Sequence, residues 1–387
     1  MFKLSRSIDT EVPQRICVLG VGGGGCRAVD YLVGGSGGPT IAAVNTDSRS
    51  LSESKAMTKI QLGISDAEGF GTGGDVDLGR MSAERDVEMI RGMFTDADVA
   101  VVVTCLGGGT GSGATPVILK AAHAAGVFTI VLATQPFEFE GEKRKSTAES
   151  SLNAVIAAAD VTCMIDNDRL FGAVGGKNIK ESFEKADKAL AAGVRSLWHM
   201  LVQPAFMGID LADLRALVSR SGGACLFGFG DARGVTRGAA AVSALLEGPV
   251  FDKGRALRTS GTALVCIAGS HDLTLTEAGD VMSAISKEAP DDCNLIMGTV
   301  VNDDWIDRVM VSVFVTDRKR VVTSKPAGGA GTSSSTKGRR NRKRDMQDKL
   351  KLDIYGKGRF KNVEATILDG MDLDIPTYVR LGIDIEK

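Results

Sequence analysis

The sequence predicts an α/β protein in which a Rossmann-like parallel-sheet domain is joined by a long central helix to a smaller α/β domain. Short apolar runs alternate with helical stretches from Ile16 to about Leu201, which is the pattern of a parallel sheet covered by helices. Glycine-rich turns follow several of these runs. Beyond Asp317 the apolar periodicity ends, which indicates a disordered linker followed by a short C-terminal peptide.

The composition excludes several classes of protein. The 387 residues, 43% of them hydrophobic, leave room for two packed domains, and a formal net charge of −2 argues against a protein that coats nucleic acid. No apolar run approaches the roughly 20 residues that span a bilayer, and no signal peptide is evident, so we expect a cytoplasmic protein. The seven cysteines form no C-x-x-C pair, which argues against a zinc site or a disulfide framework. We predict that Cys17, Cys163 and Cys266, which lie in strand-like runs, are core thiols.

We divide the chain into six segments, which are an N-terminal extension (1–15), a first domain (16–177), a central helix (178–203), a second domain (204–316), a flexible basic linker (317–361) and a C-terminal peptide (362–387). The buried strands of the first domain read ICVLG, TIAAVN, VAVVVT, FTIVLAT and VTCMID. Those of the second domain read ACLFGFG, ALVCIAG, NLIMGTVV and RVMVSVFV. The central helix has one apolar face, with residues three and four apart, formed by Ile179, Phe183, Ala186, Leu190, Val194, Leu197 and Leu201.

The first glycine-rich turn, in GVGGGGCR, has the G-x-G-x-x-G spacing at Gly20, Gly22 and Gly25. Asp47 ends the next strand, near the position of a ribose-binding acid in dinucleotide enzymes. This turn alone therefore leaves two alternatives open, a dinucleotide-dependent oxidoreductase and a tight turn without a ligand.

A second glycine-rich loop, CLGGGTGSGATPV from Cys105 to Val117, argues against the oxidoreductase, because a dehydrogenase needs no second phosphate-binding loop. Its glycines allow backbone N–H groups to approach phosphates closely, and the helix that follows adds its positive end. The P-loop pattern with its lysine is absent from the sequence. With a third loop, GFGTGGD at Gly69 to Asp75, these segments suit a nucleoside triphosphate better than a dinucleotide.

Eight segments, in order, resemble the FtsZ family of the tubulin/FtsZ superfamily, the GTPases of bacterial cell division; they are GVGGGG, AVNTD, GGGTGSG, PFEFEGEKR, NDRLF, FEKADKAL, GIDLADLRALV and LDIPTYVRL. The resemblance implies a protein that binds and hydrolyses GTP with Mg²⁺. It also implies head-to-tail assembly into filaments of the division ring, beneath the inner membrane. Residues 16–177 would then form the GTP-binding domain.

The resemblance implies the following nucleotide contacts. The phosphate loops would comprise Gly22, Gly23, Gly24 and Gly25, and Gly107, Gly108, Gly109, Thr110, Gly111, Ser112 and Gly113. Cys26 and Arg27, which follow the first loop, are further candidate cofactor contacts. The γ-phosphate loop would comprise Gly71, Thr72 and Gly73, with Asn45 and Asp47 beside the phosphates or Mg²⁺, and Glu140 and Arg144 at the ribose and phosphates. Asn167 and Asp187 would read the guanine edge, whose N–H groups a carboxylate accepts well, and Phe183 would stack on the ring. Core packing is the alternative for Phe183.

The family usually has Gly-Asn where this chain has Cys26 and Arg27. The Arg27 guanidinium either adds a base or phosphate contact or turns to solvent.

The catalytic carboxylates implied by the resemblance are Asp210 and Asp213, in GIDLADLR. They follow the far end of the central helix, tens of ångströms from the guanine contacts, so we expect them to act on the nucleotide of the next subunit. A role as helix N-caps is the alternative. Gly208 replaces the usual asparagine of this loop, which predicts slower hydrolysis and keeps open a second function, a GTP-bound scaffold that barely hydrolyses.

The C-terminal segment LDIPTYVRLGI resembles the family peptide that docks on membrane-anchoring adaptor proteins, with contacts from Leu373, Asp374, Ile375, Pro376, Tyr378, Val379, Arg380 and Leu381. The basic cluster KGRRNRKR in the linker has three readings, which are contact with anionic lipid, contact with nucleic acid, and a solvated linker kept extended by its charge.

Overall fold

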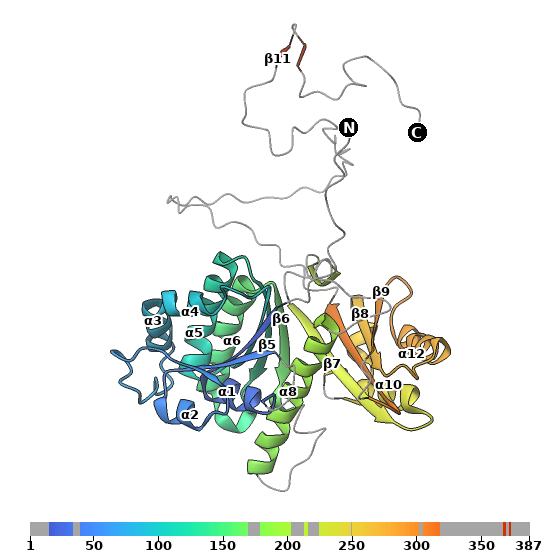
Figure 1. Cartoon of the computed structure of the whole chain (residues 1–387), viewed down its shortest axis with the longest axis horizontal. Coiled ribbons are helices and arrows are strands. Elements are labelled where there is room, and N and C mark those ends of the chain that lie inside the picture. Colours follow the sequence, from blue (N-terminus) through green and yellow to red (C-terminus); the bar gives the residue numbers. More distant parts are fainter. Residues whose placement is uncertain are drawn as a thin grey trace, which may run out of the picture. The chain divides into compact units, whose positions relative to one another are not determined.

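The computed structural model describes residues 15–33, 39–168, 179–202, 213–215, 224–248, 250–301, 305–317, 367–368 and 371–372. The chain forms two units, Met1–Ser324 and Lys325–Lys387. In the described part of the second unit, β11 (Ile367–Leu368) pairs antiparallel with β12 (Met371–Asp372). All of the other described elements belong to the first unit (Figure 1).

The first unit is built on one sheet of ten strands, in the order β3-β2-β1-β4-β5-β6-β7-β10-β8-β9. Its first six strands in sequence are all parallel, namely β1 (Ile16–Val21), β2 (Thr40–Asn45), β3 (Thr58–Gln61), β4 (Val99–Cys105), β5 (Phe128–Gln135) and β6 (Val161–Asp166). This is the order of a dinucleotide-binding Rossmann sheet, which reverses between β1 and β4. A ligand is therefore expected beyond the carboxyl ends of β1 and β4.

The remaining strands are β7 (Ala224–Arg233), β8 (Ser260–Gly269), β9 (Asn294–Val301) and β10 (Arg308–Asp317). β10 runs antiparallel to both β7 and β8, whereas β9 is parallel to β8. β7 pairs in parallel with β6 at Thr162–Ala224 and Cys163–Cys225. The strands of the two predicted domains thus form one continuous sheet.

The helices whose bounds are described are α1 (Gly22–Asp30), α2 (Ser48–Glu53), α3 (Val76–Arg85), α4 (Val87–Gly92), α5 (Gly109–Ala124), α6 (Glu142–Ala158), α8 (Ile179–Val202), α10 (Arg237–Glu247), α11 (Arg255–Arg258) and α12 (Leu275–Glu288), with a 3₁₀ turn, η1 (Glu138–Glu140). Side chains alternate between the two faces of the sheet, so Val18 of β1 packs in one core cluster and Leu19 in another. The second of these clusters includes Ile118 and Leu119 of α5.

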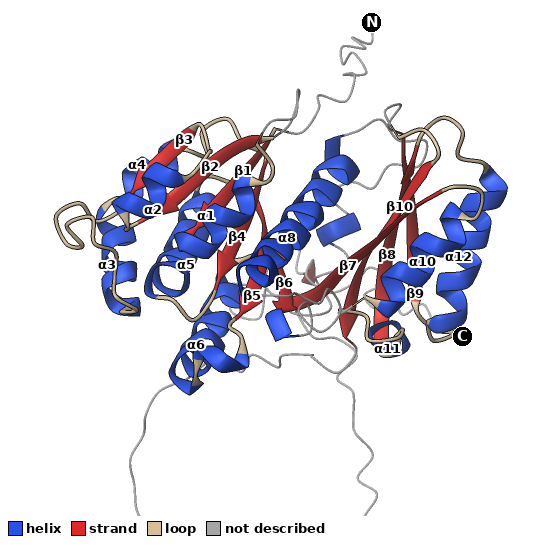
Figure 2. Cartoon of the chain, turned by 90° about the horizontal axis from the view of Figure 1, so that it is seen from below, coloured by secondary structure: helices blue, strands red, loops and turns tan. Residues whose placement is uncertain are grey.

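Helix α8 lies between the strands of the first domain and those of the second (Figure 2). Leu190, Val194 and Leu197 are almost fully buried, as their spacing predicts, and they share a core cluster with Val18 of β1 and Phe314 of β10. One core cluster therefore links the strands of the first predicted domain to the strands that follow. Cys17, Cys163 and Cys266 are buried, and all seven cysteines are free thiols.

Candidate functional site

The candidate site lies where the sheet order reverses. Helix α1 begins directly after β1, at Gly22, and α5 begins shortly after the neighbouring strand β4, at Gly109. Gly22 has a φ of +72° and Gly107 a φ of +97°, left-handed values that glycine adopts without strain. These glycines let the chain turn sharply from each strand, so both helices start at the same edge of the sheet.

The first turns of α1 and α5 leave their N–H groups available. Among the residues that the structure describes, no side chain caps either helix. By contrast, Asp47 caps α2 by accepting from the N–H groups of Arg49 and Ser50, and Asp75 caps α3 in the same way. Unpaired N–H groups and the positive ends of two helix dipoles make an anion site, and phosphate groups are a ligand that fits it.

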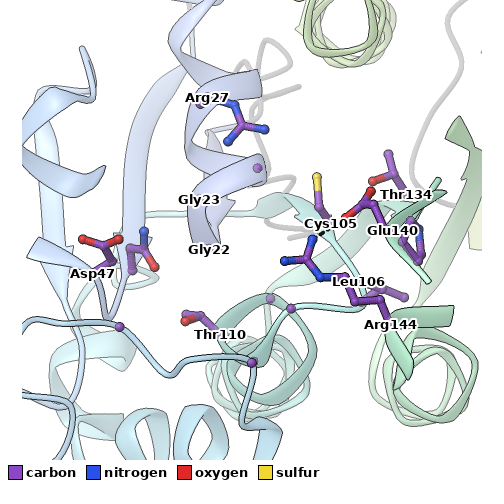
Figure 3. A pocket seen from close by; sticks show the side chains of 18 of the residues that line it. Gly22, Gly23, Arg27, Asp47, Cys105, Leu106, Thr110, Thr134, Glu140 and Arg144 are labelled. Carbon is purple, nitrogen blue, oxygen red and sulfur yellow. Dashed lines mark hydrogen bonds and ion pairs between the residues drawn. The ribbon is translucent and has the colours of Figure 1, made fainter. Parts of the chain in front are cut away.

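A cavity of about 470 Å³ opens at this edge (Figure 3). Eighteen of the residues implied by the resemblance line it, namely Gly22, Gly23, Gly24, Arg27, Asn45, Asp47, Gly71, Thr72, Gly73, Gly108, Gly109, Thr110, Gly111, Glu140, Arg144, Asn167, Phe183 and Asp187. In the view of Figure 3, Asp47 and Thr110 lie on one side, and Cys105, Glu140 and Arg144 on the other. Segments more than 100 residues apart in the sequence thus meet around one space.

Two predicted glycines are packing residues that do not line the cavity. A Cβ on Gly25 would lie 2.3 Å from the carbonyl oxygen of Val103, so this glycine lets α1 pack closely on β4. A Cβ on Gly113 would lie 2.1 Å from the carbonyl oxygen of Val76, where α5 packs on α3. Both glycines thus allow the close packing that holds the glycine loops in place.

Three further predicted residues, Cys26, Gly107 and Ser112, also lie outside the cavity lining. The buried thiol of Cys26 faces the carbonyl oxygens of Gly20 and Val44, at 3.4 and 3.7 Å, and burial raises its pKa to about 12. The N–H of Gly107 donates to the buried hydroxyl of Ser112 at 2.9 Å, which closes the second glycine loop on itself. These contacts give the three residues a structural role in the described protein.

The phosphate end of the cavity is tightly assembled. The hydroxyl oxygens of Thr46 and Thr110 lie 2.7 Å apart, which ties the end of β2 to the first turn of α5. A Cβ on Gly109 would lie 2.1 Å from Oγ1 of Thr72 and 2.4 Å from the carbonyl oxygen of Asp75. The third loop therefore lies directly against the start of α5, as expected for a loop that contacts the terminal phosphate.

Two amide side chains in the lining have unsatisfied polar atoms. Nδ2 of Asn45 and Oδ1 of Asn167 are buried and have no hydrogen-bond partner among the described residues. Asn45 is otherwise held by its Oδ1, which accepts from the N–H of Thr46 at 2.9 Å. Because unpaired buried polar atoms cost free energy, they indicate that a polar ligand supplies the missing partners.

Glu140 and Arg144, four residues apart at the end of η1 and the start of α6, form an ion pair at the side of the cavity. Oε1 of Glu140 also accepts from the N–H of Phe137 at 3.0 Å, which fixes the carboxylate at η1. The Arg144 side chain is 58% exposed, so its guanidinium can contact a ligand while it keeps the ion pair with Glu140.

The opposite end of the cavity is aromatic and acidic. Phe183 and Asp187 lie one turn apart on α8, and the ring of Phe183 packs edge-on against Phe137 at 5.2 Å between centroids. Phe183 is partly exposed to the cavity, which favours stacking on a ligand over simple core packing. Burial raises the pKa of Asp187, and the neighbouring Arg27 opposes this shift.

Eight further residues line the cavity and were not among the predicted contacts, namely Phe70, Gly74, Cys105, Leu106, Thr134, Pro136, Ala186 and Leu190. The first four of them lie within the glycine-rich loops named from the sequence. Cys105, Leu106, Thr134 and Pro136 stand at the carboxyl ends of β4 and β5, an edge that was recognisable from the strand pattern. Ala186 and Leu190 follow Phe183 at helical spacing, which we assigned wholly to the core.

The proposed catalytic segment is only partly described. Asp210 and Gly208 lie outside the described residues, whereas Asp213 lies in the described residues 213–215, which are helical. Asp213 is absent from the cavity lining. The predicted adaptor contacts, from Leu373 to Leu381, also lie outside the described residues.

Two further features are absent from the described ranges. These ranges contain no cluster of three or more metal-ligating His, Cys, Asp or Glu residues. None of their helices has both the length and the apolar character needed to cross a membrane.

Comparisons with known proteins agree with this geometry. The family model "Tubulin/FtsZ family, GTPase domain" matches residues 15–175, and "FtsZ family, C-terminal domain" matches residues 223–319. Cell division protein FtsZ 2 of Rhizobium meliloti (strain 1021) is 33% identical over 318 residues, which cover 82% of this chain and 91% of that relative.

Solved structures are similar over the same region. An empty FtsZ dimer from M. jannaschii has a TM-score of 0.73 at 29% identity, covering 80% of this chain and 90% of the other. CetZ2 from Haloferax volcanii, in a GTPγS-bound protofilament, has a TM-score of 0.64 at 24% identity and covers 79% of this chain and 95% of the other, which shows a shared fold.

Proposed function

The chain belongs to the tubulin/FtsZ family, and we propose that the cavity at the ends of β1 and β4 is where it binds GTP. It is a GTPase of this family, which assembles into filaments in a GTP-dependent way in cell division. One observation carries the assignment of the site. Two helices without side-chain caps start at adjacent strands, and a buried carboxylate and an unpaired amide oxygen face the same cavity.

The phosphates bind at the glycine loops. Backbone N–H groups of Gly22 to Gly24 and of Gly108 to Gly111 donate to phosphate oxygens, and Thr110 adds its hydroxyl. Gly71 to Gly73, packed against the start of α5, contact the terminal phosphate, so this loop distinguishes GTP from GDP. Glu140 and Arg144 contact the ribose and the phosphates.

The guanine base binds at the start of α8. The Asp187 carboxylate accepts from N1–H and the 2-amino group, which are adjacent donors on the guanine edge. Asn167, whose Oδ1 is unpaired in the described protein, supplies a further polar contact, and the Phe183 ring stacks on the base. The cavity therefore favours guanine over adenine, which presents an acceptor at the position of N1–H.

Mg²⁺ would fit the phosphate end of the cavity. Among the described residues, Asp47 is the carboxylate at this end; one of its oxygens caps α2 and the other is not used in the cap. Mg²⁺ is commonly held by one or two carboxylates, phosphate oxygens and water, so the absence of a three-carboxylate cluster in the described ranges is compatible with it. When bound, the ion would neutralise charge on the phosphates.

Hydrolysis is completed by a second subunit. Asp210 and Asp213 follow α8, whose start carries the base contacts and which spans Ile179–Val202, so the carboxylates belong near the far end of that helix. In a head-to-tail filament they reach the nucleotide of the neighbouring subunit, where a carboxylate positions the attacking water. This arrangement makes assembly a condition for hydrolysis.

A slowly hydrolysing scaffold is the second candidate, and Gly208 favours it because the loop lacks one polar side chain. Phosphate release measured against protein concentration separates the two functions. A steep rise that coincides with light scattering by filaments supports the assembly-dependent GTPase, and a trace that stays near zero while filaments form supports the scaffold. Replacing Gly208 with Asn is expected to raise the rate per assembled subunit.

The C-terminal peptide, residues 362–387, is proposed to recruit filaments to a membrane-anchoring adaptor at the division site, beneath the inner membrane. Apolar side chains around Pro376 and the positive charge of Arg380 support this role. Deleting residues 373–387 should leave GTP hydrolysis and filament formation unchanged and should abolish localisation to the division site in cells. The basic cluster KGRRNRKR is proposed as linker, with contact to anionic lipid or nucleic acid as the alternatives.

A further inference from the structure

Arg27 pairs with the residue that is proposed to read guanine. Its Nε lies 3.3 Å from Oδ2 of Asp187, and its Cζ lies 5.9 Å from the centroid of the Phe183 ring. The two ion-pair partners differ in environment, since the Arg27 side chain is 55% exposed and the Asp187 side chain 7% exposed. An exposed arginine side chain thus pairs with a buried carboxylate.

The fold places Arg27 at the base end of the cavity. It stands on α1, five residues after Gly22, and α1 packs against α8. Its guanidinium contacts Asp187 and Phe183 on α8, and its Nη2 lies 3.9 Å from the position of a Cβ on Gly24, at the end of the glycine turn that is proposed to hold phosphate. This geometry favours a contact with the base over a contact with the phosphates.

Arg27 also has space in which to move. A second cavity, of about 520 Å³, adjoins the first and shares Arg27, Phe183 and Asp187 with it. Its other lining residues are Asp30, Tyr31, Lys55, Lys180 and Glu184. Because Arg27 lines both cavities, its guanidinium can swing aside to admit a base and remain beside it.

The Arg27–Asp187 pair is complementary to guanine in particular. A carboxylate accepts from N1–H and the 2-amino group, and a guanidinium donates to O6 and N7, as arginine does to guanine in protein–DNA complexes. O6 is next to N1–H on the ring. The adjacent Asp187 carboxylate and Arg27 guanidinium therefore match the adjacent N1–H donor and O6 acceptor. Adenine has an amino group in place of O6, which would face the donors of Arg27 unfavourably.

We propose that Arg27 is a second guanine-specific residue, which donates to O6 and N7 of the bound base while Asp187 accepts from N1–H and the 2-amino group. This proposal rests on the proposed function, since it assumes that the base occupies the cavity beside Phe183. In the nucleotide-free protein Arg27 forms an ion pair with the buried carboxylate of Asp187. When the base binds, its N–H groups donate to that carboxylate in place of Arg27.

Base analogues test the proposal in the full-length protein. Affinities are measured by competition with a fluorescent GTP, using GTP, 7-deaza-GTP, which lacks the N7 acceptor, and ITP, which lacks the 2-amino group. Wild type should bind 7-deaza-GTP about tenfold more weakly than GTP, because one of two hydrogen bonds from Arg27 is lost. In Arg27→Gln this ratio should fall toward one, whereas the discrimination against ITP, which depends on Asp187, should persist.

Arg49→Gln is the matched control, since Arg49 is an exposed arginine on α2 that is absent from the lining of both cavities. It should keep both ratios of wild type. An unchanged 7-deaza ratio in Arg27→Gln, or equal wild-type affinities for GTP and 7-deaza-GTP, overturns the proposal; the second result needs no variant to fold. Failure of the proposed function looks different, because wild type would then bind neither GTP nor ITP.

Discussion

The hydroxyl oxygens of Thr46 and Thr110 lie 2.7 Å apart at the phosphate end of the cavity, and both residues are buried. This contact joins the segment after β2 to the first turn of α5. Replacing Thr46 with Val removes it without touching the cavity lining, to which Thr46 does not belong. We expect a loss of about 1 kcal/mol in the free energy of unfolding and a GTP affinity reduced severalfold, because Thr110 loses its fixed orientation. Urea unfolding and GTP competition measure the two effects; an unchanged GTP affinity would contradict this account.

Asp187→Asn should change the base specificity of the protein. The amide can donate to the 2-carbonyl oxygen of xanthine but can no longer accept from both N–H groups of guanine. We expect GTP affinity to fall by more than tenfold and XTP to bind better than GTP, since a site built around hydrogen bonds rejects a mismatched partner strongly. Competition binding with both nucleotides measures this change. Glu184→Gln, on the same helix and paired with Lys180, should retain the preference for GTP.

The glycines of the first loop should respond differently to alanine. A Cβ on Gly25 would lie 2.3 Å from the Val103 carbonyl oxygen, whereas a Cβ on Gly23 would have its nearest contact at 3.6 Å, with Oγ of Ser50. Gly25→Ala should therefore lower the melting temperature of the protein substantially, because α1 must shift away from β4. Gly23→Ala is the matched control for the fold and should melt near wild type. Equal melting temperatures for the two variants would argue against a packing role for Gly25.

His199 should make the stability of the protein depend on pH. Its ring is buried between Trp198 and Trp305, and burial lowers its pKa to about 4, with Arg195 and Arg308 adding to the effect. Between pH 6.5 and about 4 the unfolded chain binds a proton that the folded chain does not, so stability decreases as pH falls through this window. The loss from this residue amounts to about 3 kcal/mol. Urea unfolding at several pH values should show this slope in wild type, and His199→Phe, which keeps an aromatic ring, should lose that part of it.

Much of the fold follows from sequence patterns that act locally. The predicted buried runs became strands because continuous apolar segments can be covered on both faces, and the apolar stripe of α8 is buried as its spacing requires. Strand β3, Thr58–Gln61, was missed because a short edge strand with exposed Thr58 and Lys59 has little apolar signal. The continuous sheet was also missed, since the pairing of Cys163 with Cys225 joins segments 62 residues apart.

The candidate site was predictable in its parts more than in its arrangement. A glycine pattern does not tell which glycine faces a ligand and which faces another backbone, so Gly22 and Gly25 look alike in sequence although the first lines the cavity and the second packs on β4. The pairing of Arg27 with Asp187 joins residues 160 positions apart and depends on how α1 packs against α8. Local patterns carry no information about such a contact.

The central claim is that one subunit completes the hydrolysis of GTP bound by another, and mixing two inactive proteins tests it most directly. The double variant Asp210→Asn/Asp213→Asn keeps the GTP cavity and lacks the catalytic carboxylates. Asp187→Asn, supplied with XTP, keeps the carboxylates and does not use GTP.

Release of labelled phosphate from GTP should be near zero for each protein alone and should appear when both are mixed under conditions in which filaments sediment. A triple variant carrying all three changes is the control partner and should restore nothing. Co-sedimenting filaments without GTP hydrolysis above the sum of the separate rates would contradict the account.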